Sequence, residues 1–101
     1  MRIVVLFNLK PGIDPAAYEA WAREIDIPGC NALASIDRFS VHRATGIFGS
    51  DAPSPYQYVE IIDITAIDPF VAEISTEAFQ KVSAAFGDYA DNPQFILTED
   101  L

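Results

Sequence analysis

The chain has few of the residues on which catalytic and metal sites usually depend. Its 101 residues include one cysteine, Cys30, and one histidine, His42. A lone cysteine cannot form a disulfide within the chain and fits a reducing compartment, so we expect a cytoplasmic protein. One histidine and one cysteine are too few for a usual zinc or haem site. We therefore expect no metal and no cofactor.

Positive charge and long apolar runs are also scarce. Six lysines and arginines face fifteen acidic residues, which gives a net charge of −9. Such a surface repels phosphate, so neither nucleic acid nor an anionic membrane is expected as a partner. No apolar run reaches the roughly 18 residues of a membrane span. The first run stops at Asn8 and Lys10 without a signal-peptide cleavage site.

What the sequence does contain is enough apolar residues for one packed core. Half of the chain is hydrophobic, and a chain of this length forms one domain, residues 1–101. Patterns rich in β-branched and aromatic residues predict strands over residues 2–9, 38–45, 56–64 and 94–99. The first of them is apolar on both faces, which is typical of a central strand.

Two helical segments separate these strands. Asp14 followed by Pro15 predicts the start of the first, which carries an apolar stripe and ends near Ile27, before Pro28–Gly29. The stripe residues are Tyr18, Trp21, Ala22 and Ile25. Asp68–Pro69 predicts the start of the second, and Gly87 its end. Ser75 or Thr76 can cap a fresh turn, so this helix is expected to be broken in two.

The order β-α-β-β-α-β predicts an α+β, ferredoxin-like fold with four antiparallel strands and both helices on one face. Helices cover only one side of a sheet, yet the strands over 2–9 and 56–64 are apolar on both sides. A second copy packing sheet on sheet would bury the other side. We therefore expect a homodimer, a dimeric α+β barrel.

Four stretches carry a family resemblance: "MRIVVLFNLKPG", "YEAWAREIDIPGCNALASIDRFSVHRATG", "PYQYVEIIDI" and "ISTEAFQKVSAAFGDYADNP". Through them the chain resembles the RedY-like (HapK) family within the dimeric α+β barrel superfamily. The resemblance implies a role in making a prodigiosin-type, pyrrole-containing secondary metabolite. The superfamily also holds cofactor-free monooxygenases, cyclases, decarboxylases, haem-degrading enzymes and plain ligand binders, and the fold does not choose among them.

The candidate catalytic residues are His42 and Glu60. If the loop over 46–55 closes a symmetrical hairpin, His42 lies opposite Glu60, within interacting distance. A carboxylate there would orient the imidazole, which titrates near neutral pH, and make it a better base. A shift of one residue in register would separate the pair.

Five further residues are candidate ligand contacts around this pair: Asn8, Tyr18, Trp21, Ser40 and Tyr58. The same strand parity would place the polar ones beside His42 and Glu60 on the helix-facing side. Tyr58 and Asn8 could donate hydrogen bonds to a carbonyl. Tyr18 and Trp21 would give an aromatic wall, although residues at helical spacing are more often core.

Three other residues are weaker candidates for a site. Arg38 and Arg43 have opposite parity and do not form one anion site, and Cys30 lacks the adjacent base of a nucleophile. The expected function is therefore that of a cofactor-free enzyme or accessory protein. It would bind a small pyrrole-type intermediate between sheet and helices and assist its proton transfer, cyclisation or condensation. A non-catalytic binding protein and a cofactor-independent monooxygenase are the alternatives.

Overall fold

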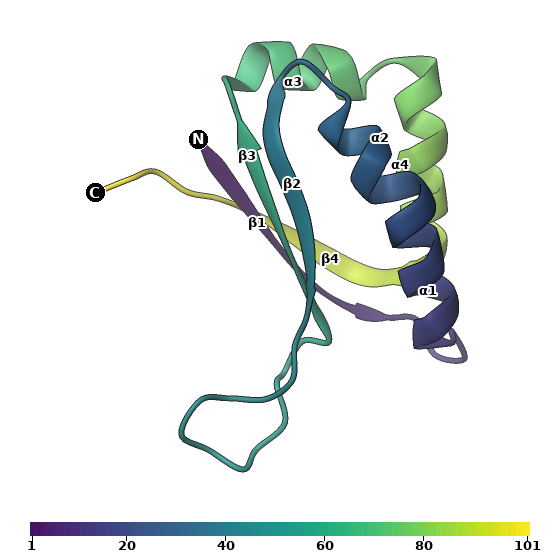
Figure 1. The fold of residues 1–101 in the computed structure, drawn as a ribbon, viewed down its shortest axis with the longest axis vertical. Helices are drawn as coiled ribbons and strands as arrows, with labels where there is room; N and C mark the ends of the chain where they lie inside the picture. Colours follow the sequence, from purple (N-terminus) through teal and green to yellow (C-terminus); the bar gives the residue numbers. More distant parts are fainter.

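The computed structural model describes residues 1–101, and Figure 1 shows one sheet with all helices on one side of it. In chain order the elements are β1 (Arg2–Leu9), α1 (Pro15–Trp21), the π-helical turn η1 (Ala22–Asp26), α2 (Ile27–Asn31), β2 (Ile36–Arg43), β3 (Tyr58–Ile64), α3 (Ile67–Ile74), α4 (Glu77–Tyr89) and β4 (Ala90–Leu97). The strand order is β2-β3-β1-β4, and every pair is antiparallel. The predicted ferredoxin-like α+β fold is confirmed.

The two central strands are β1 and β3, as their apolar character predicts. β1 has the predicted bounds, and its burial alternates along the strand, with Ile3, Val5, Phe7 and Leu9 facing the helices. β4 begins at Ala90, directly after α4 and earlier than predicted. A register shift between Leu6 and Asn8, together with the positive φ of 46° at Asn92, adapts this early stretch to β1.

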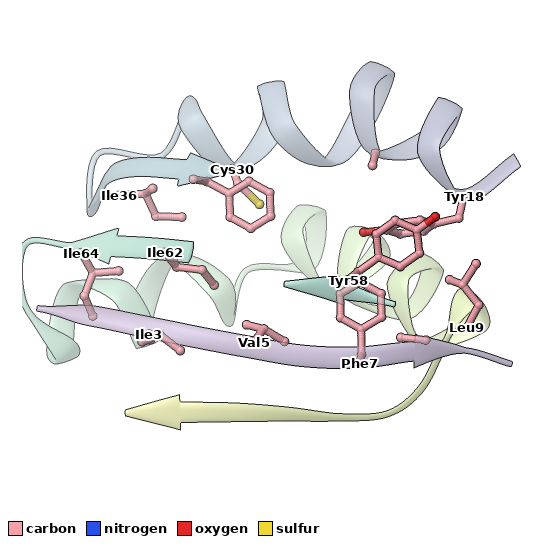
Figure 2. Close-up of a cluster of buried hydrophobic side chains, with 13 residues drawn as sticks. Ile3, Val5, Phe7, Leu9, Tyr18, Cys30, Ile36, Tyr58, Ile62 and Ile64 are labelled. Carbon is pink, nitrogen blue, oxygen red and sulfur yellow. The ribbon is translucent and has the colours of Figure 1, made fainter. Parts of the chain in front are cut away.

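The core lies between the sheet and the helices (Figure 2). Aromatic rings fill the end near the start of α1. The Phe7 ring stacks on Tyr58 with centroids 5.5 Å apart and meets Tyr18 edge-on at 5.6 Å. Phe86 of α4 meets the same Phe7 ring edge-on at 5.1 Å. Edge-to-face and offset contacts at these separations add to the free energy of burial. The first helical segment, through Tyr18, and the second, through Phe86, therefore both pack on Phe7.

The first helical segment continues further than the sequence predicts. Asp14 caps it as expected, because the Ala16 amide donates to Asp14 Oδ1 at 3.0 Å. The predicted end near Ile27 is wrong, since α1, η1 and α2 run on through Pro28 to Asn31. The Ile27 amide bonds to the Ala22 carbonyl, five residues back, which is the wide turn of a π-helix. That turn leads directly to Pro28, which has no N–H to donate.

The second helical segment is broken as predicted. Thr76 caps α4, with the Phe79 amide donating to Thr76 Oγ1 at 3.3 Å. The details at the two ends differ from prediction. Asp68 lies within the first turn of α3 instead of capping it, and α4 passes Gly87 and ends at Tyr89. No helix in the structure combines the length and apolarity needed to cross a bilayer.

The face of the sheet away from the helices is apolar in its centre. We call this side of the sheet the open face. Five side chains form its apolar centre: Val4, Leu6, Val59, Ile61 and Ile96. All of them retain solvent exposure in the single chain, and Ile96 is 41% exposed. No helix packs here, so the single chain leaves this apolar surface open to solvent.

Candidate functional site

The pairing of β2 with β3 separates the two predicted catalytic residues. Val41 lies opposite Glu60, and His42 lies opposite Val59. The expected His42–Glu60 pairing is therefore wrong by one residue. Side chains alternate along a strand, so this difference places His42 on the opposite face from Glu60. A bulge between Ile36 and Arg38 and a connecting loop over 44–57 set this register.

Two other predicted polar contacts also lie away from Glu60. Ser40 shares the face of His42, and its Oγ is 2.9 Å from His42 Nε2. Asn8 holds the loop that joins β2 to β3: its Nδ2 donates to the Pro55 carbonyl at 3.2 Å, and its Oδ1 accepts from the Gln57 amide at 2.9 Å. Neither side chain lines the space between sheet and helices.

Glu60 does lie in that space, on the helix-facing side of β3. Only 3% of its surface is exposed, and its Oε2 has no hydrogen-bond partner. Burial, and then the nearby Asp26 carboxylate, raise the pKa of Glu60 to about 8. A buried carboxylate without a partner is costly, so at neutral pH Glu60 is mostly the protonated acid.

The first helical segment brings two more reactive groups against the sheet. Tyr18, Ala22, Asp26 and Cys30 follow one another at intervals of four residues, and all are buried. A regular α-helix would rotate such a series steadily around its axis. The extra width of η1 compensates and keeps the four side chains on one face, which Figure 2 shows for Tyr18 and Cys30.

Asp26 is thus an internal acid held by a π-helical turn, a feature frequent at functional sites. Its only hydrogen-bond partner is the Cys30 thiol, with Sγ 3.4 Å from Oδ1. Burial raises the pKa of Asp26 to about 6. Burial, together with Asp26, also raises the pKa of Cys30 far above its usual range. The thiol is therefore a hydrogen-bond donor and not a nucleophile at neutral pH.

Asp26, Cys30 and Glu60 line one cavity of about 360 Å³. Its remaining walls come from β2, β3, α3, α4 and β4: Ile36, Phe39, Ile62, Phe70, Ile74, Phe79, Val82, Ser83, Phe86, Gly87, Pro93 and Phe95. This volume falls at the lower end of the roughly 300–1,000 Å³ typical of small-molecule sites. We call it the acidic cavity, because it has two carboxyl groups and no basic side chain.

The predicted aromatic contacts lie at one end of this region. Tyr18 is fully buried, and its hydroxyl lies beside Glu60 without a hydrogen bond of normal geometry. Burial, and then the charge of Glu60, raise the pKa of Tyr18 far above its usual range. Trp21 is half-buried, with its ring 6.1 Å from that of Tyr18.

Tyr58 instead belongs to an ion-pair network outside the acidic cavity. Its hydroxyl donates to Glu19 Oε2 at 2.7 Å, and Arg43 Nε donates to the same oxygen at 2.8 Å. The hydrogen bonds from Arg43 and Tyr58 lower the pKa of Glu19 to about 2. Together with Tyr18, these residues border a second, smaller cavity of about 80 Å³.

Of the predicted site residues, only Glu60 lines the acidic cavity. Tyr18 and Tyr58 border the smaller cavity, and the Trp21 ring lies beside that of Tyr18. Asn8, Ser40 and His42 lie on the other side of the sheet. Sequence reasoning did not single out Asp26. The only signal available was the spacing of four between Tyr18, Ala22, Asp26 and Cys30. The regular helical stripe favoured Ile25 instead, which is 49% exposed.

The sheet, its one-sided helical layer and the cavity between them define a ferredoxin-like protein of the dimeric α+β barrel fold. Solved structures agree with this class. A mutant form of SnoaB, a cofactor-independent oxygenase from Streptomyces nogalater, is 17% identical with a TM-score of 0.72, and the match covers 99% of this chain and 93% of that one. A dimeric ferredoxin-like protein from Thermobifida fusca is 15% identical with a TM-score of 0.68, covering 94% and 85%. At these identities the likeness concerns the fold alone.

The particular family follows from the sequence profile of the REDY-like protein HapK, which matches residues 1–101. The chain belongs to this family. The crystal structure of HapK from Hahella chejuensis is 32% identical, with a match that covers 100% of this chain and 93% of that one, and superposes with a TM-score of 0.76. No curated protein matches the sequence.

Proposed function

We propose that this protein binds a small pyrrole-type intermediate of prodigiosin-type pigment biosynthesis in the acidic cavity and assists a proton transfer on it. The observation that carries this proposal is Glu60: a buried acid, with an unpartnered oxygen, in the wall of a cavity of ligand size. The pathway named in the proposal is supported by membership of the REDY-like HapK family, because the resemblance to that family implies a role in making prodigiosin-type pigments.

The walls of the cavity suit a flat heteroaromatic ring. Phenylalanine side chains line it from β2, α3, α4 and β4: Phe39, Phe70, Phe79, Phe86 and Phe95. Aromatic pairs favour stacked and edge-on contacts, which a pyrrole can make with these rings. Polar groups are few, and Asp26 lies near enough to Glu60 for its charge to act on it. A small number of polar groups orients a ligand within an apolar site.

Glu60 has the properties of a general acid that works near neutral pH. With a pKa of about 8, the carboxyl group is protonated at neutral pH, yet it is acidic enough to transfer that proton. In the proposed step the Glu60 O–H transfers its proton to a ring carbon of the pyrrole and leaves a ring cation beside the Glu60 carboxylate. That carboxylate then takes a proton back from the same carbon, which restores the acid and the aromatic ring.

The second part of the proposal is a homodimer formed through the open face. The apolar residues Val4, Leu6, Val59 and Ile61 lie in its centre, and aligned packing of two sheets would remove them from water. His42 and Ser40 share this face. Under this proposal both belong to the dimer interface and have no part in proton transfer.

A binding and exchange experiment tests the cavity. The probe is 2,2′-bipyrrole-5-carbaldehyde, and its binding is followed by quenching of Trp21, the single tryptophan. Exchange of the probe's ring protons in D₂O is followed by NMR. The wild type is expected to bind the probe and to accelerate exchange. Glu60→Gln should keep binding and lose the acceleration, since an amide has no acidic proton to transfer.

The matched control is His42→Ala, on the other side of the sheet, which should leave both binding and exchange unchanged. Loss of exchange in His42→Ala with normal exchange in Glu60→Gln would overturn the assignment of the proton donor. Tight binding by the wild type without faster exchange would favour the non-catalytic binding protein. Absence of any binding would contradict the proposal as a whole.

A further inference from the structure

The charges around the acidic cavity do not balance. Asp26 is 5% exposed and Glu60 is 3% exposed, and neither forms an ion pair. Asp26 has a thiol as its sole hydrogen-bond partner, and Glu60 Oε2 has none. Buried carboxylates in proteins are normally paired with a cation or fully hydrogen-bonded, so this pair lacks a positive charge.

No protein side chain supplies that charge. The titratable residues that face Glu60 are Tyr18 of α1, Asp26 of η1 and Cys30 of α2, and none of them is a cation. The side chains that line the cavity from β2, α3, α4 and β4 include no titratable group. Arg23 and Arg43 are both paired with Glu19 and line the smaller cavity instead.

Resting on the proposed function, in which proton transfer leaves a ring cation beside an ionised Glu60, we infer that the acidic cavity selects a flat nitrogen base in its protonated, cationic form, with the positive charge held between Asp26 and Glu60. The ligand's N–H groups would donate to the free Glu60 Oε2 and to Asp26. Charge-assisted bonds of this kind are stronger than neutral ones, and more so out of water. Carboxylates and phosphates are excluded from the same site, because no cation there compensates their charge.

Before a cationic ligand binds, the two carboxyl groups still hold a proton that they can release. With pKa values of about 6 for Asp26 and about 8 for Glu60, one proton resides on the pair near pH 7. A bound cation stabilises the ionised form of both carboxyl groups. Binding of an already protonated base is therefore accompanied by release of the Glu60 proton, whereas a neutral ligand releases none.

Three bicyclic probes of similar size test the inference by calorimetry at pH 7: 4-aminoquinoline, a cation at this pH; 1-naphthylamine, which is neutral; and 1-naphthoate, an anion. We expect 4-aminoquinoline to bind at least about tenfold more tightly than 1-naphthylamine, a difference of about 1.4 kcal/mol, and 1-naphthoate not to bind. Measurements in phosphate and in Tris should differ in heat for the cation alone, because only its binding releases a proton.

Variants assign the effect to the pair. Glu60→Gln should abolish proton release, and Asp26→Asn should remove most of the preference for the cation. Glu24→Gln is the matched control, because Glu24 is an exposed acid on the same turn as Asp26 and should behave like the wild type. Equal binding of the cation and 1-naphthylamine overturns the inference while leaving a ligand-binding cavity. Preference that survives in both Asp26→Asn and Glu60→Gln also overturns it, and failure of all three probes to bind would contradict the inference and the proposed cavity together.

Discussion

The Cys30 thiol donates a hydrogen bond to Asp26 Oδ1 over 3.4 Å, and both residues are buried on the sheet-facing side of the first helical segment. Both ends of this contact are unusual. The thiol is held in its protonated form by burial and by the carboxylate beside it. The carboxylate accepts its one hydrogen bond from a weak donor. This contact makes the chemistry of the single cysteine depend on its acidic neighbour.

Alkylation of Cys30 should therefore be slow in the folded protein. Only the thiolate reacts, and a raised pKa together with burial removes both the thiolate and the access to it. The rate of labelling with iodoacetamide at pH 8 is expected to be more than about tenfold lower in the native protein than in urea. Asp26→Asn should increase the native rate, since it removes a charge that opposes the thiolate. Equal rates with and without urea would contradict the buried placement of Cys30.

Stability should depend on Glu60 between its two pKa values. The pKa of Glu60 is about 8 in the folded protein, against 4.5 as its ordinary value. In this interval the folded state holds a proton that the unfolded chain has lost, so the free energy of unfolding decreases as the pH rises from about 4.5 to 8. Asp26 acts in the same direction between 3.8 and about 6.

Urea denaturation at pH 5, 6, 7 and 8 measures this dependence. Glu60→Gln should lose the decrease above pH 6 and unfold at higher urea concentration than the wild type at pH 8, because the charge of an ionised Glu60 is then no longer buried. Glu24→Gln, an exposed substitution, should keep the wild-type dependence. A free energy of unfolding that rises from pH 6 to 8 would be incompatible with the buried acid.

Shortening the π-helical turn by one residue should destabilise the protein. Deletion of Ile25, an exposed residue of η1, would convert the turn to a regular α-helix while keeping Tyr18, Ala22, Asp26 and Cys30 on one face. Pro28 would then stand inside a regular helix, at a cost of about 3 kcal/mol. Thermal unfolding should show a large loss of stability, recovered in part by adding Pro28→Ala. A deletion variant as stable as the wild type would show that Pro28 does not need the wide turn.

The open face should hold two copies together. Replacing Ile61 by aspartate places a charge in the middle of an interface with no partner for it, which opposes dimerisation strongly. Sedimentation equilibrium is expected to give a dimer for the wild type and a monomer for Ile61→Asp. Asp37→Asn, an exposed change on β2, serves as the control and should remain dimeric. A monomeric wild type at micromolar concentration would refute the proposed interface.

The parts of this structure that local chemistry determines could be predicted from the sequence. The apolar run over residues 2–9 was enough to predict β1. Asp14–Pro15 predicted the start of the first helix, and a cap at Ser75 or Thr76 predicted the break before α4. Glu60 could be singled out because an unpaired carboxylate within an apolar strand is costly to bury. These features depend on a few adjacent residues, so their patterns are readable without the rest of the fold.

Features that depend on distant or irregular geometry could not be predicted in the same way. The partner of His42 is set by a bulge near Asp37 and by the path of the loop over 44–57, and an error of one residue reversed the face. The apolar stripe at regular helical spacing included Ile25 and left out Asp26, whereas the π-helical turn rotates Asp26 inward and Ile25 outward.

The acidic cavity also divides its two properties between separate stretches of the chain. Its charge comes from Asp26 and Glu60, on η1 and β3, whereas most of its apolar wall comes from α3, α4 and β4, all beyond residue 66. Substitutions in the later stretch can therefore reshape the space without disturbing the carboxyl pair. The shape of the site and its charge are therefore set by different parts of the chain, so that each can be altered by substitution without the other.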